Sequence, residues 1–388
     1  MGLFERIFGS SKSPPKVQGD YKMLTGYAPS FTNYNGQLYE SELVRAAVNA
    51  NATNISKLKV EFFGHGATFL SKRLERPNAF QTWSQFLYRL ATIYYTDNTA
   101  FICPVLDKMN RVTEIYAVLP SRAKVVSVNN SPWLAFEFRD GHIMQEPLWR
   151  LGIMRRFQYR NDVFGENNDA MNSTMQMVEI QQQGVTEAVK SAATYRFMAQ
   201  MGNLSLGTDI GKARDDFNSQ NFGKKGGGLI LFPSTFSNIQ QINSHPYVVD
   251  AEQLKVIRNN VFEYFNVNED ILQSRAYGDK WTAYYESVVE AFAIQFSEVL
   301  THMMMLNGEL SGTDCGVCAT ANRLQYMSNA EKLNVSSQLA DRGILNRDEV
   351  REIWNLPPLP DGEGKAYVIR GEYQNANEKI NGGDSDAD

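Results

Sequence analysis

The sequence predicts an α+β fold in which a region of mixed helices and strands is joined to long helices. Short alternating apolar segments separated by turn residues occupy residues 99–151, which is typical of strands. Residues 169–202 contain no proline and repeat apolar residues every three or four positions, which indicates a long helix. A Gly-rich segment, residues 203–248, then separates this helix from another at 249–267. The expected succession is therefore helix, small module, helix.

The composition is that of a folded protein with room for two or three domains. The 388 residues are 43% hydrophobic and 21% charged, within the ordinary globular range. Three cysteines provide no disulfide framework, which suits a reducing compartment. No apolar run is long enough to span a bilayer and the start lacks a secretory pattern, so we expect a soluble cytoplasmic product without a membrane partner. A net charge of -5 disfavours a tight grip on duplex DNA.

The first hundred residues are predicted to form an arm, two helices and a strand. Residues 1–40 are rich in Ser, Pro, Gly, Asn and Tyr and should lie on a neighbour or stay loose. A helix follows, with Leu43, Ala46, Ala47 and Ala50 at helical spacing, and then a strand with alternating Leu58, Val60 and Phe62. Thr82 can cap the next helix, whose apolar residues are Trp83, Phe86, Leu87 and Leu90. Asp97-Asn98 and Asp140-Gly141 supply turn chemistry among the strands that reach Leu151.

The long helix and the module after it are predicted in more detail. As one helix, residues 169–202 would extend about 50 Å, with Gly184 able to bend it. The module contains a possible small helix at 212–218, a loop at 223–228, the strand LILF and the segment FSNIQQIN. Asp250 with Gln253 can cap the second helix, which carries Leu254, Ile257, Val261 and Tyr264.

The remaining chain is predicted to be mostly helical. After a loop at 268–280, a third helix presents Trp281, Tyr285, Val288, Phe292, Phe296, Val299, Met303 and Leu306. Val289 and Ile294 lie off this stripe, so the helix should be buried on more than one side. A strand-like piece, GVCATANRLQYM, precedes two brief helices at 329–339 and 346–355, the latter capped by Asn346 with Glu349 and stopped by Pro357. Residues 371–388 should form a disordered acidic tail.

No pattern in the sequence supports catalysis or a cofactor. Cys315 and Cys318 have the spacing of half a zinc site or of a redox pair, but neither Cys103 nor His302 completes a site, so reduced thiols at a strand are favoured. The glycines near Lys212 and Lys224 have the wrong spacing for a phosphate-binding loop. The four histidines are scattered and no catalytic motif is present. We therefore expect no enzyme activity and no cofactor.

Three stretches are distinctive in their order and combination. They are RPNAFQTWSQFLYRLATIYYTDNTAF, TEIYAVLPSRAKVV and GILNRDEVREIWNLPPLPDGEG. The chain resembles, in these stretches, the portal (head-tail connector) proteins of tailed bacteriophages, particularly the compact branch found in long-tailed phages. The likeness runs from about residue 40 to 370, and the turn reads TDNTA where the family has a GNA-type turn.

The resemblance implies a portal fold with an α/β wing, long stem helices, a small α/β clip and a helical C-terminal crown. The implied divisions are an arm at 1–40, wing at 41–168, stem helix at 169–202, clip at 203–248, stem helix at 249–267, tunnel loop at 268–280, a long helix with the rest of the wing at 281–328, crown at 329–370 and tail at 371–388. It also implies a dodecameric ring, located at the capsid vertex of the virion and present in the host cytoplasm during assembly. The implied partners are double-stranded DNA passing through the channel, the terminase large subunit, the head-tail adaptor, and the major capsid and scaffold proteins.

Site residues follow from this layout as hypotheses. Gln273, Arg275, Tyr277 and Lys280 of the tunnel loop would line the DNA channel, with Arg275 and Lys280 meeting phosphates weakly, because many strong contacts would hold DNA fast. Lys224 and Lys225 would make clip contacts. ATP hydrolysis would belong to the packaging motor. Alternatives are another ring or tube component of a phage, such as an adaptor or tail protein, and a nucleotide- or zinc-dependent enzyme.

Overall fold

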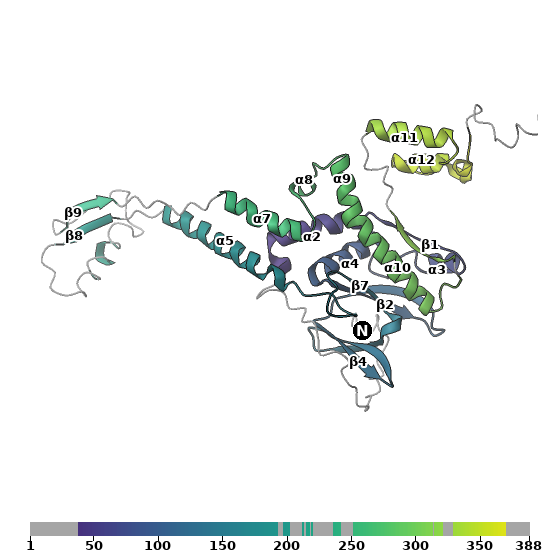
Figure 1. The fold of residues 1–388 in the computed structure, drawn as a ribbon, viewed down its shortest axis with the longest axis horizontal. Coiled ribbons are helices and arrows are strands. Elements are labelled where there is room, and N and C mark those ends of the chain that lie inside the picture. Colours follow the sequence, from purple (N-terminus) through teal and green to yellow (C-terminus); the bar gives the residue numbers. More distant parts are fainter. Residues whose placement is uncertain are drawn as a thin grey trace, which may run out of the picture. The chain divides into compact units, whose positions relative to one another are not determined.

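The computed structural model describes residues 38–192, 197–201, 212, 215–217, 219, 236–241, 251–312, 314–320 and 329–369 (Figure 1). The chain divides into two compact units, one made of Met1–Asn172 with Asn259–Asp388 and the other of Ser173–Arg258. No helix in these described stretches is both long enough and apolar enough to cross a bilayer.

The first unit begins with a layer of helices. A 3-10 turn, η1 (Leu38–Glu40), leads into α2 (Glu42–Ile55), and α3 (Ala67–Arg73) and α4 (Trp83–Asp97) follow. The side chains of α2 that are buried are Val44, Ala47, Val48, Asn51, Ala52 and Ile55. The predicted helix is present, but of the predicted apolar set only Ala47 is on the buried face. The larger side chains of Val44 and Val48 bury more apolar area than Ala46 and Ala50. The buried face of the helix is therefore rotated by about one residue from the predicted face.

The ends of α4 follow the predicted local chemistry. The Thr82 hydroxyl accepts from the backbone N–H of Gln85, and the Gln85 side chain accepts from the backbone of Thr82, so both halves of a capping box are present. At the other end Asn98 adopts a left-handed conformation with φ 55°. Phe86, Leu87 and Leu90 are fully buried, as the helical spacing predicts.

Two three-stranded antiparallel sheets face each other across the main core. The first has the order β3-β2-β7, formed by β2 (Thr99–Leu106), β3 (Val112–Val118) and β7 (Gly152–Arg155). The second has the order β4-β5-β6, formed by β4 (Arg122–Val128), β5 (Ser131–Glu137) and β6 (Ile143–Pro147). A 3-10 turn, η2 (Leu148–Arg150), connects β6 to β7. Phe101 of the first sheet and Phe136 of the second meet edge to face, with ring centroids 4.9 Å apart.

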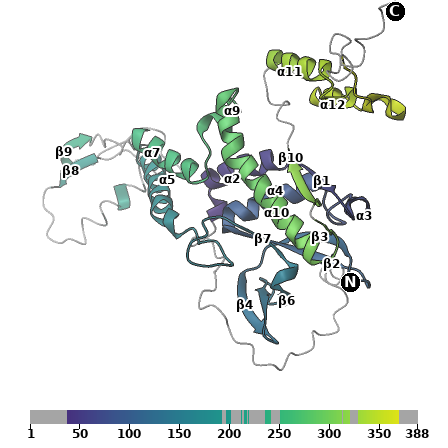
Figure 2. The same ribbon diagram turned by 45° about the vertical axis from the view of Figure 1, so that its right-hand side comes forward.

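The unit is closed by segments that are far apart in sequence. β1 (Lys59–Phe63) pairs antiparallel with β10 (Gly316–Thr320), with Lys59 opposite Thr320. Figures 1 and 2 show the long helix α10 (Ala291–Leu306) lying beside β10 and across β7. A Cβ at Gly152 would come within 3.1 Å of Val299 and 3.3 Å of the Met303 sulfur, so glycine permits the close contact between β7 and α10.

The long helix is continuous but not regular. It consists of α9 (Asp279–Tyr284), a π-helical turn, η4 (Tyr285–Glu290), and α10. It therefore begins two residues before the predicted start and contains one wider turn, a feature that periodicity alone does not indicate. Val289 is buried as expected, whereas Ile294 is 55% and Leu306 43% exposed in the single chain.

The second unit contains most of both predicted stem helices. After the 3-10 turn η3 (Asp169–Met171), α5 spans Asn172–Ala192, and residues Phe197–Met201 form β8, which pairs antiparallel with β9 (Phe236–Gln241). A single helix over 169–202 is therefore wrong: Phe197–Met201 belongs to a strand, where aromatic and apolar side chains are well accommodated. The other stem helix is α7 (Ala251–Tyr264), which crosses from the second unit into the first.

Only parts of the predicted module lie among the described residues. Residues 212, 215–217 and 219 are helical, within and next to the predicted small helix. The strand LILF, the loop at 223–228, Lys224, Lys225 and Asp250 lie outside the described residues. So do the N-terminal arm to residue 37 and the tail beyond residue 369.

The C-terminal part consists of two short helices that pack together. α11 (Asn329–Asp341) and α12 (Arg347–Ile353) match the predicted pair, and a 3-10 stretch, η6 (Pro360–Lys365), follows. Asn346 accepts from the backbone N–H of Glu349 (2.9 Å) while the Glu349 carboxylate accepts from the backbone N–H of Asn346 (2.8 Å). This is the capping box predicted for the second helix.

Candidate functional site

The predicted tunnel loop is partly helical. Asn268 accepts from the backbone N–H of Ile271 (3.0 Å) and so caps a short helix, α8 (Glu269–Leu272). The open connection is limited to residues 273–278, because Asp279 and Lys280 already belong to α9. An uninterrupted loop over 268–280 is therefore wrong. Its first end is helical because an Asn cap and two acidic residues in the first turn favour a helix start.

The four predicted channel residues are all exposed on this segment. Lys280 is paired with Asp270, with 2.6 Å between Nζ and Oδ2, and Gln273 donates to the Glu269 carboxylate (3.1 Å). Tyr277 is 76% exposed. Arg275 forms no ion pair with any residue that the structure describes. The segment 268–280 has a formal net charge of -1, since Glu269, Asp270 and Asp279 outnumber Arg275 and Lys280.

Glycine sets the geometry at the end of the connection. Gly278 has φ 56° and ψ -129°, a backbone conformation that side chains other than hydrogen strongly disfavour, and it immediately precedes α9. A Cβ there would have no neighbouring atom within 4 Å, so the glycine serves backbone conformation and not close packing. Residues 273–278 thus end at a turn that the local sequence makes sharp.

A buried amide holds the two ends of this segment together. Asn51 of α2 donates to the carbonyl oxygen of Phe265 (2.8 Å) and accepts from the Tyr284 hydroxyl (2.9 Å). Burial raises the pKa of Tyr284 to about 12, so the hydroxyl remains a donor at neutral pH. Sequence reasoning missed Asn51, although a polar residue on an otherwise apolar helix face was the available signal.

A second buried network joins the beginning of the α5 region to the end of α7. Asn168, just before η3, accepts from the Tyr264 hydroxyl (2.8 Å) and from Asn98 (2.7 Å). Its own amide donates to the carbonyl oxygen of Thr96, at 2.5 Å. Gly165 lies against this network, where a Cβ would come within 2.3 Å of the Asn98 carbonyl oxygen. These hydrogen bonds hold the chain just before α5 and the end of α7 at one place in the first unit.

Arg156 lies among aromatic rings beside this network. The Arg156 guanidinium lies 4.2 Å from the Phe157 ring centroid and 5.1 Å from those of Tyr95 and Tyr264. It donates through Nη2 to the Tyr264 carbonyl oxygen, and its Nη1 has no hydrogen-bond partner among the described residues. Burial lowers the pKa of Arg156. Cation–π contacts with these rings stabilise the Arg156 cation in place of an ion pair with a carboxylate among the described residues. Together with the hydrogen bond to Tyr264, they hold the end of α7.

Asp97, next to this network, predicts a pH dependence of stability. Desolvation raises the pKa of its carboxyl to about 7, against the opposing influence of Arg139. The folded state keeps this proton up to about pH 7, while the unfolded chain releases it near pH 4, so stability should fall as pH rises between these values. Asp97→Asn should remove about 1–2 kcal/mol of this fall, less than the full shift would imply because Asp97 remains partly exposed.

Urea unfolding of the wild type and Asp97→Asn at pH 5, 6, 7 and 8 would measure this difference. The variant should be the more stable of the two at pH 8 and should show a flatter profile. Asp140→Asn, in the exposed β5–β6 turn, is the matched control and should leave the profile unchanged. Parallel profiles for the wild type and Asp97→Asn would contradict the prediction.

The cysteines are not grouped with other metal ligands in the part of the chain that the structure describes. Cys315 is buried and its thiol donates to the Gly312 carbonyl oxygen (3.2 Å), Cys318 is half-buried on β10, and Cys103 is buried in the core between the sheets. Burial raises the pKa of Cys103. Among the described residues no three His, Cys, Asp or Glu side chains come together as a metal site requires.

Comparison with known proteins gives a consistent family assignment. The family model described as "Phage portal protein" matches residues 42–355. No curated protein sequence matches the chain.

Solved structures show the same fold at low sequence identity. A chain from the neck of an empty gene transfer agent particle has a TM-score of 0.55 and 13% identity, over 83% of this chain and 92% of that one. A chain from the virion of the native gene transfer agent particle has a TM-score of 0.55, 14% identity and the same coverage. An HK97-family phage portal protein from Corynebacterium diphtheriae has a TM-score of 0.51 and 11% identity, over 76% of this chain and 96% of that one.

Proposed function

Because this chain belongs to the phage portal protein family, we propose that twelve copies form a ring at the capsid vertex through which double-stranded DNA is packaged and ejected. The family is structural and its members form oligomeric rings in phage particles, so the chain is a particle component and not an enzyme. The family predicted from the three sequence stretches is thus confirmed. Terminase, the head-tail adaptor, and the capsid and scaffold proteins are proposed partners, met in the particle and in the host cytoplasm during assembly.

The parts of the chain are assigned within this proposal. The two facing sheets and helices α2, α3, α4 and α10 form the wing, α5 and α7 the stem, and α11 with α12 the crown. The clip lies between α5 and α7 and would carry the terminase and adaptor contacts, including those of Lys224 and Lys225. The segment 268–280, reduced to the connection 273–278 between short helices, is the tunnel loop.

The observation that carries the proposal is the character of this loop. It exposes Arg275 and Tyr277 on a base held by Asn51, and its charges nearly cancel. A strongly basic loop repeated around a ring would bind phosphates tightly and oppose movement. A nearly neutral loop whose exposed Arg275 has no ion pair among the described residues suits DNA that must slide past.

Imaging of the purified chain by negative-stain electron microscopy tests the ring. Rotationally symmetric particles with a central hole wide enough for a duplex are expected. A protein that stays monomeric across concentrations and salt conditions would overturn the proposal.

Charge reversal in the loop tests the channel. Arg275→Glu with Lys280→Glu should reduce packaged DNA several-fold while rings still form, because the substituted loops repel phosphates. Arg275→Glu alone should account for most of the loss, since Lys280 is already paired with Asp270. Packaged DNA per head, measured by quantitative PCR after nuclease treatment, is the readout.

Lys108→Glu, in the exposed β2–β3 turn, is the matched control and should package normally. Undiminished packaging by the double variant in heads with intact rings would remove Arg275 and Lys280 from the channel lining.

A further inference from the structure

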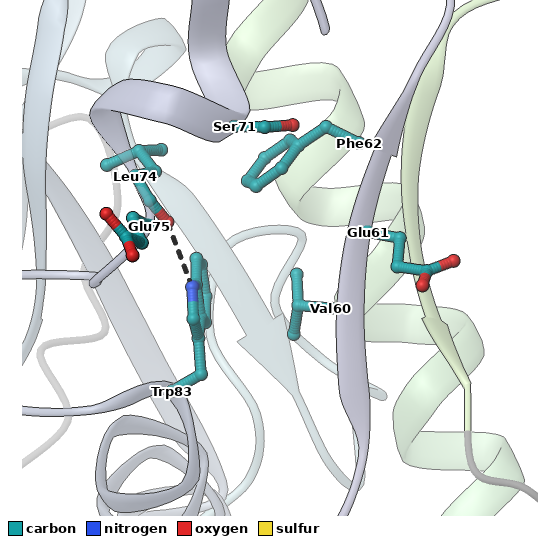
Figure 3. A pocket seen from close by; sticks show the side chains of 7 residues that line it. All are labelled: Val60, Glu61, Phe62, Ser71, Leu74, Glu75 and Trp83. Carbon is teal, nitrogen blue, oxygen red and sulfur yellow. Dashed lines mark hydrogen bonds between the residues drawn. The ribbon is translucent and has the colours of Figure 1, made fainter. Parts of the chain in front are cut away.

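A groove in the first unit has no role in the proposed function. It measures about 390 Å³ and lies between β1, the end of α3 and the beginning of α4. Figure 3 shows Val60 and Phe62 of β1 directed toward Trp83, with Leu74 beside the indole. The Phe62 and Trp83 ring centroids are 6.1 Å apart at an interplanar angle of 57°. The groove is therefore walled by two aromatic rings.

The indole is held in place by the protein itself. Trp83 Nε1 donates to the Leu74 carbonyl oxygen (3.0 Å), the bond drawn in Figure 3. This bond satisfies the only polar group of the side chain, so its ring face is left to contact something apolar. Phe62 and Trp83 are both only half-buried in the single chain. The wall is thus rigid, aromatic and incompletely covered.

An exposed carboxylate, Glu75, stands at the rim of the groove. Glu75 is exposed and pairs with no basic side chain in the described parts of the chain. Glu61 also touches the groove, but Figure 3 shows it pointing to the other side of β1, and it is paired with Lys59 at 3.2 Å. An aromatic groove with an exposed carboxylate at its edge suits a proline-containing segment that carries a cation.

The chain contains a segment of this chemistry. Lys12-Ser13-Pro14-Pro15-Lys16 places two prolines between two lysines, and residues 1–37 as a whole have four basic and two acidic residues. The chain's other Pro-Pro pair, Pro357-Pro358, is followed by Asp361 and Glu363 and has the opposite charge. Charge complementarity with Glu75 therefore selects the N-terminal segment.

The segment can reach the groove of its own chain. Leu38 lies just before α2 and Val60 just after it, and the 14 residues of α2 extend only about 21 Å. Residues 17–37 can span up to about 70 Å when extended, well beyond this separation. Attachment through such a short connection also gives a millimolar effective concentration, so weak contacts suffice for docking.

We propose that the segment Lys12–Lys16 of the N-terminal arm docks in the Phe62–Trp83 groove of its own chain. Pro14 and Pro15 contact the two rings, and a flanking lysine pairs with Glu75. The groove is thus a binding site for a basic polyproline segment, and the arm is its ligand.

Disulfide trapping in the full-length chain tests this proposal. Ser13→Cys is combined with Ser71→Cys, a position that lines the groove, and with Ser131→Cys at the exposed first residue of β5 as the control. Under mild oxidation the 13–71 pair should form an intrachain disulfide at least about tenfold faster than the 13–131 pair, the ratio for 1.4 kcal/mol of docking free energy. Peptide mapping by mass spectrometry identifies the linked residues, and circular dichroism shows that each variant is folded.

Charge variants separate docking from chance encounter. Glu75→Lys in the 13–71 background should slow disulfide formation several-fold, and Glu61→Lys, which points away from the groove, should not. Equal rates for the 13–71 and 13–131 pairs, or insensitivity to Glu75→Lys, would overturn the proposal. Disulfides that link two chains in place of one would overturn the assignment to the chain's own arm.

Discussion

Glu309→Ala is expected to lower the free energy of unfolding by about 3–5 kcal/mol, the range for breaking a buried ion pair by removing one partner. The Glu309 side chain is almost fully buried and meets Arg73 of α3 through both carboxylate oxygens, with 3.2 Å between Nη1 and Oε1. It also accepts the backbone N–H of Val112 in β3. Removing the carboxylate leaves a half-buried cation and a buried N–H without partners.

Urea unfolding followed by far-ultraviolet circular dichroism would measure this loss. Glu309→Gln should lie between the wild type and Glu309→Ala, because the amide keeps an acceptor for Val112 but loses the charge. Asp270→Asn breaks the exposed Lys280–Asp270 pair and is the matched control, with an expected loss of about 0–1 kcal/mol. Equal effects of Glu309→Ala and Asp270→Asn would show that the buried pair contributes no more than a surface pair.

Substituting aspartate for both Met177 and Ile180 is expected to prevent ring assembly without unfolding the chain. These two α5 residues lie three positions apart on one helix face and are 53% and 66% exposed in the single chain. In the proposed ring this face would pack against the neighbouring copy. Each new charge would have to lose its hydration at every contact between copies around the ring. The fraction of chains in rings should therefore fall at least about tenfold, the ratio for 1.4 kcal/mol of contact free energy.

Size-exclusion chromatography with light scattering and negative-stain imaging would measure the ring fraction. Gln182→Asp adds the same charge to the same helix at an exposed position about 140° from Met177 and about 160° from Ile180, and should assemble normally. Rings formed at wild-type yield by the Met177 and Ile180 double variant would exclude this face of α5 from the subunit contact.

Local chemistry explains why the helix starts were predictable. Both capping boxes are formed by side chains three residues apart, Thr82 with Gln85 and Asn346 with Glu349. They therefore need no tertiary contact. The loop is shorter than the predicted 268–280 for a related reason. The Asn268 side chain caps α8, so its local chemistry also starts a helix.

Periodicity was less reliable where a strand partner was remote. Phe197–Met201 continues an apolar spacing that suits a helix, yet it pairs with β9, 35 residues or more along the chain. The π-helical turn at Tyr285–Glu290 has no signature in the sequence, because only packing on both sides of the helix decides where a wider turn is tolerated.

The family, the capped starts of α4 and α12 and the near-neutral charge of the loop segment could be inferred from residue identity and short spacing alone, and so could most of the order of helices and strands. The polar residues that hold this segment, the beginning of the α5 region and the end of α7 depend on tertiary contacts. Asn51, Asn168, Arg156 and Glu309 each bind groups from distant parts of the chain. A buried polar side chain must find its partner wherever the fold brings one, and the distance along the sequence carries no information about that meeting.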